Sequence, residues 1–243
     1  MIPKIIHYCW FGGAPLPPLA EKCIASWKKH CPDYEIKEWN ETNYDISKNI
    51  YMKQAYENKK YGFVPDYARL DIIYNNGGVY LDTDVELIKQ IDDLLCCEAF
   101  AGIENSSEKV ALGLGFGAEK GATIIKELRD CYDNLLFVEN GEMNLTPAPV
   151  INTAFLKEKG YVYSKEKHTF ESLTIFPSEY FCPTDMKTGK INITKNTYSI
   201  HHYAASWCDR GSRIRGKIYR TVNRIFGEKV ANFLKKVFGK KKK

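Results

Sequence analysis

The spacing of hydrophobic residues in the first forty positions predicts a strand, a helix and a second strand. Residues 4–11 (KIIHYCWF) are rich in β-branched and aromatic side chains and end at Gly12-Gly13, as is typical of a buried strand. The next apolar residues recur at helical spacing: Ala20, Cys23, Ile24, Trp27 and Cys31. Residues 34–39 then alternate apolar and charged side chains, the period of a strand. This order indicates an α/β fold with a largely parallel sheet, whose ligand site lies at the carboxyl ends of the strands.

The most informative segment is residues 64–86 (VPDYARLDIIYNNGGVYLDTDVE), which follows a probable helix at 51–60. Pro65 suits the first turn of a helix, and Asn75 to Gly78 suits its end. Between them, one helical face is apolar and comprises Tyr67, Leu70, Ile73 and Tyr74. Residues 79–81 then extend as a strand toward Asp82. The segment therefore predicts a helix and a strand that ends in acidic residues.

The rest of the chain predicts fewer elements. We expect strands at residues 100–103, 173–176 and 198–202, a helix at 121–132, and a loop at 140–149. Residues 214–238 show two amphipathic helical runs with Gly227 between them. The expected organisation is one catalytic domain, residues 1–209, followed by a basic amphipathic helical tail, residues 210–243.

Composition narrows the class of protein. The chain has 243 residues, of which 44% are hydrophobic and 27% charged, so it can bury a core, and no apolar stretch is long enough to cross a bilayer. The apolar run after Met1 contains Pro3, Lys4 and His7 and lacks a small-residue cleavage site, which argues against a signal peptide and for a cytosolic location. The eight cysteines form no CxxC pair, so we expect free, mostly buried thiols.

Charge is distributed unevenly along the chain. The net charge is +5, but the tail holds thirteen Lys or Arg and one acidic residue, so residues 1–209 carry −7. The acidic domain and the lack of an aromatic platform beside the basic residues argue against nucleic acid as a partner. A basic tail with an apolar stripe favours an anionic membrane surface. The alternative is that the stripe packs on the catalytic domain and only the last lysines are free.

Asp82 and Asp84 are the first candidates for chemistry. Carboxylates two residues apart in an extended stretch point the same way and can bind one hard divalent cation, although a solvated strand end is the alternative. Asp66 and Arg69 lie three residues apart on the preceding helix, where they share a face. They could contact a polar ligand together or form a surface salt bridge.

Three motifs in order resemble the family of glycosyltransferase family 32 sugar-binding regions containing a DXD motif, which includes capsular polysaccharide and lipopolysaccharide transferases. The central motif runs from Asp66-Tyr67-Ala68-Arg69 to Gly77-Gly78-Val79-Tyr80-Leu81-Asp82-Thr83-Asp84. The opening, residues 2–12, is similar to the family's first strand, and residues 199–207 (SIHHYAASW) are similar to its closing motif. The resemblance covers residues 1 to about 207.

The resemblance implies a GT-A type nucleotide-sugar-binding fold with a Rossmann-like mixed sheet, a nucleotide-sugar donor, and Mn²⁺ or Mg²⁺. By position it implies that Asp82 and Asp84 bind the metal together with His201, rather than His202. It implies that the donor is bound by Trp10 on the nucleotide base, Asp66, Arg69, Tyr80 and Asp82 around the ribose and sugar, and Ser206 and Trp207 at the diphosphate. The variable loops, residues 105–117 and 147–153, would form the acceptor site. Trp10 and Trp207 could instead be core residues.

These assignments predict a metal-dependent retaining hexosyltransferase, with Asp82, Asp84 and Arg69 as catalytic residues and a UDP-sugar as the default donor. The acceptor would be a glycan or a lipid-linked oligosaccharide in cell-surface polysaccharide synthesis, reached from the cytoplasmic face of the membrane. No covalent nucleophile stands out, which favours attack on the leaving-group side. The alternatives are a catalytically silent nucleotide-sugar or glycan-binding module of the same fold, and a nucleotidyltransferase, for which no glycine-rich phosphate loop is found.

Overall fold

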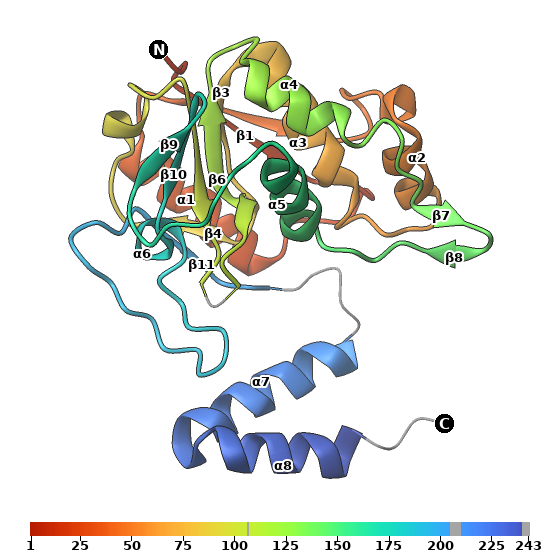
Figure 1. Cartoon of the computed structure of the whole chain (residues 1–243), viewed down its shortest axis with the longest axis vertical. Coiled ribbons are helices and arrows are strands. Elements are labelled where there is room, and N and C mark those ends of the chain that lie inside the picture. Colours follow the sequence, from red (N-terminus) through yellow and green to blue (C-terminus); the bar gives the residue numbers. More distant parts are fainter. Residues whose placement is uncertain (106, 205–209, 240–243) are drawn as a thin grey trace.

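A central seven-stranded sheet organises the computed structural model, which describes residues 1–105, 107–204 and 210–239 (Figure 1). The strand order is β2-β1-β3-β6-β5-β10-β9, and two small sheets, β11-β4 and β7-β8, lie outside it. The strands are β1 (Ile5–Cys9), β2 (Glu35–Trp39), β3 (Gly78–Tyr80), β4 (Val85–Leu87), β5 (Ala99–Ile103), β6 (Val110–Ala118), β7 (Val138–Glu139), β8 (Glu142–Met143), β9 (His168–Phe170), β10 (Leu173–Phe176) and β11 (Ser199–His201).

The central sheet is mixed rather than largely parallel. The strand β1 pairs in parallel with both β2 and β3, and β5 pairs in parallel with β10. The long strand β6 runs antiparallel between β3 and β5, and β9 is an antiparallel edge. The carboxyl ends of β1 and β3 therefore meet at one edge of the sheet, where the sequence predicted a ligand site.

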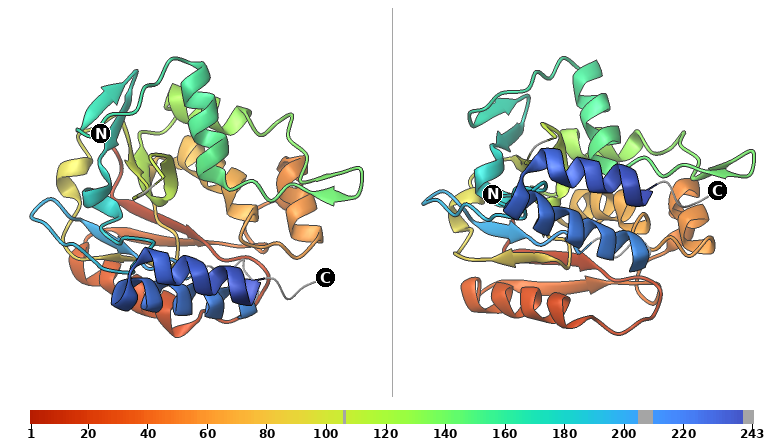
Figure 2. Two further views of the ribbon diagram at one scale, coloured as in Figure 1. Left: turned by 60° about the horizontal axis from the view of Figure 1, so that its bottom comes forward. Right: turned by 90° about the horizontal axis from the view of Figure 1, so that it is seen from below.

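Helices cover both faces of this sheet (Figure 2). One hydrophobic core lies under α2, α3, α4 and α5, and the second lies under α1, α6 and β4. The helices are α1 (Pro18–His30), α2 (Ile50–Glu57), α3 (Val64–Asn76), α4 (Thr123–Asp130), α5 (Ala148–Glu158), α6 (Ser178–Phe181), α7 (Arg210–Phe226) and α8 (Glu228–Gly239), with short 3₁₀ turns η1 (Ile46–Lys48) and η2 (Asp92–Leu94). None of the described helices is long and apolar enough to span a bilayer.

Most predicted elements are present, and two regions differ from prediction. Residues 140–149 are not a continuous loop, because they contain β8 and the first turn of α5. The nine-residue strand β6 was not predicted, because its three glycines weaken the usual strand signal. Glycine does suit this strand, since a Cβ on Gly117 would come within 2.6 Å of the Phe100 ring.

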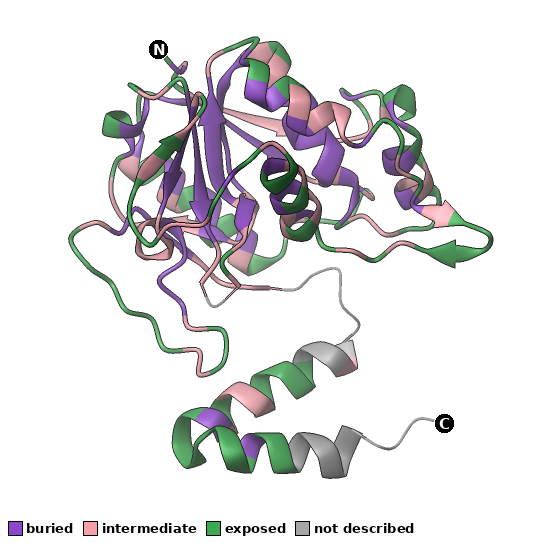
Figure 3. Ribbon diagram, in the orientation of Figure 1, coloured by how far each residue is buried: buried purple, intermediate pink, exposed green. Residues whose placement is uncertain are grey.

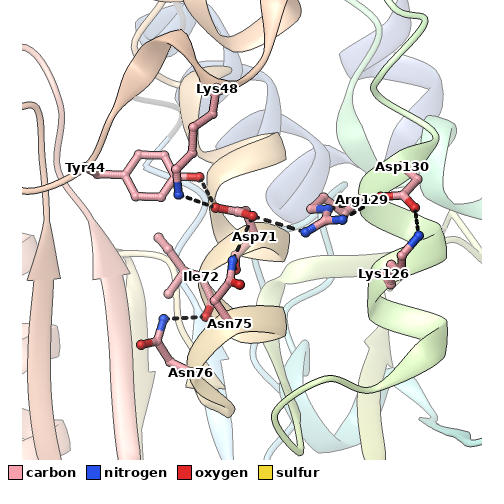
Figure 4. A network of polar contacts seen from close by, with 9 residues as sticks. All are labelled: Tyr44, Lys48, Asp71, Ile72, Asn75, Asn76, Lys126, Arg129 and Asp130. Carbon is pink, nitrogen blue, oxygen red and sulfur yellow. Dashed lines mark hydrogen bonds and ion pairs between the residues drawn. The ribbon is translucent and has the colours of Figure 1, made fainter.

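A buried carboxylate anchors α3 to its neighbours (Figure 4). Asp71 accepts hydrogen bonds from Tyr44 Oη at 2.8 Å and from Lys48 Nζ at 2.9 Å, and it pairs with Arg129 Nη1 at 3.2 Å. Burial raises the pKa of Asp71, but these hydrogen bonds outweigh it, so the pKa lies below its ordinary value. The network joins α3, which carries the Asp66–Arg69 pair, to η1 and α4.

Residues 210–239 form a hairpin of two helices, α7 and α8, at one end of the molecule (Figure 1). Gly227 joins them with φ at 84°, a left-handed conformation that favours glycine. Asn223 and Ala231 are buried between the helices. Most side chains described on this hairpin are exposed (Figure 3).

Candidate active site

The two aspartates of the DXD motif lie in a tight turn that follows β3. The N–H of Val85 donates to the carbonyl of Asp82 at 3.0 Å, which closes the turn and starts β4. The prediction that an extended chain would align the carboxylates is therefore wrong about the backbone, because the segment reverses direction here. The turn nevertheless brings carboxylate oxygens of Asp82 and Asp84 within 4.8 Å of a His201 ring nitrogen.

His201 reaches this turn because the last strand of the domain pairs with the strand after the motif. β11 runs antiparallel to β4, with His201 opposite Val85. The Nε2 atom of His201 lies 3.1 Å from Asp84 Oδ1. The adjacent His202 contacts a different carboxylate, Glu86 Oε2, at 2.7 Å. Only the first of the two histidines thus joins the DXD carboxylates, in agreement with the expected choice of His201.

The backbone after β11 also contacts the motif. Tyr203 has φ at 51°, an unusual left-handed conformation for a residue other than glycine. This turn directs the N–H of Ala204 to Asp84 Oδ2 at 2.8 Å. The hydroxyl of Tyr203 contacts Cys182 Sγ at 2.8 Å, which holds the turn against the domain. The closing segment therefore fixes the orientation of Asp84 on both carboxylate oxygens.

Arg69 lies buried behind Asp82. Its Nη1 is 3.4 Å from Asp82 Oδ1, its Nη2 is 2.9 Å from Asp66 Oδ1, and its Nε donates to the Pro65 carbonyl at 2.9 Å. Its guanidinium carbon lies 5.1 Å from the centre of the Tyr80 ring. Asp66 and Arg69 are each only 5% exposed, so their pair is not a surface salt bridge. The arrangement points a fixed positive charge at the DXD turn.

The two motif carboxyls have pKa values shifted in opposite directions. Burial raises the pKa of Asp82, with Arg69 opposing the rise and the Asp84 charge adding to it. Burial also acts on Asp84, but the charge and hydrogen bond of His201 outweigh it and lower the pKa to about 2. Burial raises the pKa of Asp66 to about 7 against the pull of Arg69. Asp84 is therefore the carboxylate held most firmly in its charged form.

The donor set fits a divalent cation. Two carboxylates and one imidazole nitrogen can converge on one point, and such ligands suit Mn²⁺ and also Mg²⁺. Among the residues that the structure describes, this is the one group of three acidic, histidine or cysteine side chains with this geometry. These residues would hold the metal, and its bound charge would stabilise an anionic leaving group.

The remaining predicted donor residues lie at different depths. Trp10 follows β1, is partly exposed, and donates from Nε1 to the Ala14 carbonyl at 2.6 Å. Tyr80 is 1% exposed and supports Arg69 from below. Ser206 and Trp207 lie outside the described residues.

Sequence reasoning missed Gly113, which lies on β6 directly beside the site. A Cβ at this position would lie 2.2 Å from Asp82 Oδ2 and 2.9 Å from Arg69 Nη1. The carbonyl of Gly113 also accepts the N–H of Asp82 at 3.3 Å. Only glycine therefore leaves room for the Asp82–Arg69 pair. The available signal was the alternation of glycine with apolar residues at positions 112–117, which has the period of a strand.

Comparison with known proteins identifies the class. Residues 17–101 match the family described as "Glycosyltransferase sugar-binding region containing DXD motif". The matched segment includes Asp66, Arg69, Asp82 and Asp84 but ends before His201. No curated protein matches the chain in sequence.

Solved structures show the same fold. The PaToxG glycosyltransferase superposes with a TM-score of 0.52 at 19% identity, covering 65% of this chain and 69% of that chain. A glycosyltransferase involved in the glycosylation of the major capsid of PBCV-1 has a TM-score of 0.48 at 10% identity, covering 86% of this chain and 98% of that chain. The glycosyltransferase GlyE of Streptococcus pneumoniae TIGR4 has a TM-score of 0.45 at 13% identity, covering 96% of this chain and 64% of that chain.

The matched segment and the fold together place the protein among the glycosyltransferases that carry a DXD motif. The expected GT-A type α/β fold is confirmed.

Proposed function

We propose that the protein transfers a sugar from a nucleotide-sugar donor, with UDP as the default nucleotide, to a glycan or lipid-linked acceptor, with retention of configuration. The observation that carries this proposal is the convergence of Asp82, Asp84 and His201 in front of the buried guanidinium of Arg69. A diphosphate leaving group needs its developing charge neutralised, and this site presents a cation-binding set and a fixed positive charge side by side.

In this mechanism each residue has a separate task. Asp84 would bind the metal as a carboxylate oriented by His201 and by the Ala204 N–H. Asp82 would contact both metal and donor, and Arg69 would stabilise the departing diphosphate. Asp66 and Tyr80 position Arg69. Trp10, at the end of β1, would contact the nucleotide base. Because no nucleophilic side chain belongs to this group, the acceptor hydroxyl would attack on the leaving-group side.

A hollow beside the site supports an acceptor with many hydroxyl groups. It has a volume of about 310 Å³ and is lined by Ile103, Glu104, Asn105, Ser107, Glu108, Tyr163 and Ser178. Its carboxylates and its aromatic ring are the groups that hydrogen-bond and stack on sugars. Asn105 donates its N–H to Cys182 Sγ, the same atom that contacts Tyr203 beside His201. We therefore place the acceptor at the end of β5, in the region where the resemblance expected it.

The metal would be Mn²⁺ or Mg²⁺, and the setting would be cell-surface polysaccharide synthesis. The competing proposal is a silent module that binds a nucleotide sugar or a glycan without transfer. The fully formed set of Asp82, Asp84, His201 and Arg69 favours the enzyme.

Thermal unfolding with a panel of UDP- and GDP-sugars, with and without Mn²⁺, tests the donor assignment. A donor at one hundred times its dissociation constant should stabilise the wild type by about 2.7 kcal/mol, only when metal is present, and should leave an Asp84→Ala variant unchanged. Product formation from the same donor then separates transfer from silent binding. Stabilisation that needs no metal would contradict the proposed site.

A further inference from the structure

The helical hairpin α7–α8 exposes a row of large apolar side chains. Six of them are between 41% and 65% exposed: Ile214, Ile218, Ile225, Phe226, Val230 and Phe233. The alternative in which this stripe packs on the catalytic domain is therefore wrong for these residues. Exposed apolar residues grouped in this way mark an interaction surface.

The exposed residues of the two helices lie on one face. At about 100° per residue, the apolar residues of α7 are displaced from the buried Asn223 in the same rotational sense as those of α8 from the buried Ala231. The hairpin brings the helices together in opposite directions, with Tyr219 Oη donating to Asn232 Oδ1 at 2.9 Å. Two antiparallel helices with this displacement present their apolar residues on the same side of the pair.

This face points away from the catalytic domain. The described contacts between hairpin and domain are made by the loop between α6 and β11. The Asn223 amide donates to the Lys187 carbonyl at 3.0 Å, Glu228 pairs with Lys187 Nζ at 3.1 Å, and Arg220 lies against Gly189. Asn223, Arg220 and Glu228 project from the opposite side of the helices, and their contacts leave the apolar face uncovered.

We propose that the α7–α8 hairpin docks the enzyme on an anionic membrane surface, with its apolar face in the headgroup region. Charge complementarity selects this partner. The tail carries thirteen basic residues and one acidic residue, which attracts anionic lipid and repels the same tail of a second copy. Basic residues on the polar face and Ile and Phe on the other are the pattern of helices that lie in the membrane interface. This surface would hold the catalytic domain beside a lipid-linked acceptor.

Vesicle flotation tests the proposal with the full chain. The probe is vesicles of equal parts phosphatidylglycerol and phosphatidylcholine, compared with phosphatidylcholine alone. The wild type should float with the anionic vesicles, and less so as salt is raised. A variant with Ile218→Ser, Ile225→Ser and Phe233→Ser should bind at least about tenfold more weakly. A matched variant on the catalytic domain, with Met143→Ser, Val162→Ser and Ile193→Ser, removes equally exposed apolar side chains and should float like the wild type.

Each other outcome would overturn the proposal. Equal flotation of the hairpin variant and the wild type, or no flotation with anionic vesicles, excludes docking through this face. A dimer in sedimentation that the hairpin substitutions abolish would assign the face to a second copy instead. Circular dichroism establishes that all variants are folded. Donor-dependent thermal stabilisation should be the same in all of them, so a failure of membrane binding is distinguishable from a failure of the proposed activity.

Discussion

His201 Nε2 lies 3.1 Å from Asp84 Oδ1, although the two residues come from opposite ends of the catalytic domain. The pairing of β11 with β4 produces this contact, so the final strand of the domain completes a site that begins at β3. Metal binding and the position of the closing strand should therefore depend on each other.

The first prediction compares the adjacent histidines. A His201→Ala variant should bind Mn²⁺ at least about tenfold more weakly, because it removes one ligand and one partner of Asp84. A His202→Ala variant loses only its contact with Glu86 and should keep wild-type metal affinity. Calorimetric titration with Mn²⁺ measures both. Equal losses in the two variants would show that the effect is structural.

The second prediction concerns the room that Gly113 leaves. A Gly113→Ala variant should displace the Asp82 carboxylate, whose Oδ2 would lie 2.2 Å from the new Cβ, and should abolish donor-dependent stabilisation. Gly216→Ala is the control, since nothing lies within 4 Å of its Cβ and it is in α7. That change should raise stability by up to about 1 kcal/mol without affecting the donor. Normal donor binding by Gly113→Ala would contradict the described packing.

The third prediction concerns the Asp71 network of Figure 4. An Asp71→Asn variant should lower the free energy of unfolding by roughly 3 kcal/mol, because it leaves Lys48 and Arg129 without their shared buried carboxylate. Asp130→Asn removes a more exposed partner of Arg129 and should cost less than about 1 kcal/mol. Urea denaturation of the three proteins measures the difference, and equal costs would argue against the network.

The fourth prediction concerns pH and His7. Burial lowers the pKa of this histidine from 6.5 to about 4, with the Gly77 carbonyl opposing the shift. Its Nδ1 accepts a hydrogen bond from Trp39 Nε1 at 3.0 Å, so the folded state holds the neutral ring. The unfolded chain binds the proton more readily between these pH values. Stability should therefore fall as the pH decreases from about 6.5 to about 4, by roughly 3 kcal/mol from this residue.

The same experiment on His7→Gln provides the comparison. This variant should lose the His7 contribution to the pH dependence and give a flatter curve in that range. An NMR titration of the His7 ring in the wild type gives an independent readout. A pKa near 6.5 would contradict the buried neutral state.

The sequence predicted the elements whose local pattern is strong. The helix at residues 64–76 has a proline start, an apolar face and a glycine end, and β10 is an uninterrupted apolar run bounded by turn residues. The strand β6 and the helix α5 escaped prediction, because glycines interrupt the first and Pro149 falls in the first turn of the second. Local signals fail where a residue type is selected by packing against another element.

The candidate site was predicted less evenly. The pattern of residues indicated Asp82 and Asp84, but the turn that brings them together follows from the pairing of β4 with β11. His201 was assigned through the family resemblance, since no local spacing links it to the motif. Gly113 acts through empty space next to Asp82, which only the folded structure reveals.

Mn²⁺ binding by Asp84→Asn tests the central claim most directly. Free Mn²⁺ can be followed by electron paramagnetic resonance as protein is added, with UDP present to complete the site. We predict that the wild type removes the free-ion signal, that Asp84→Asn leaves it largely unchanged, and that Glu142→Gln, which removes an exposed carboxylate on β8, behaves like the wild type. If Asp84→Asn binds Mn²⁺ as tightly as the wild type, the site formed by Asp82, Asp84 and His201 is not the metal site of this glycosyltransferase.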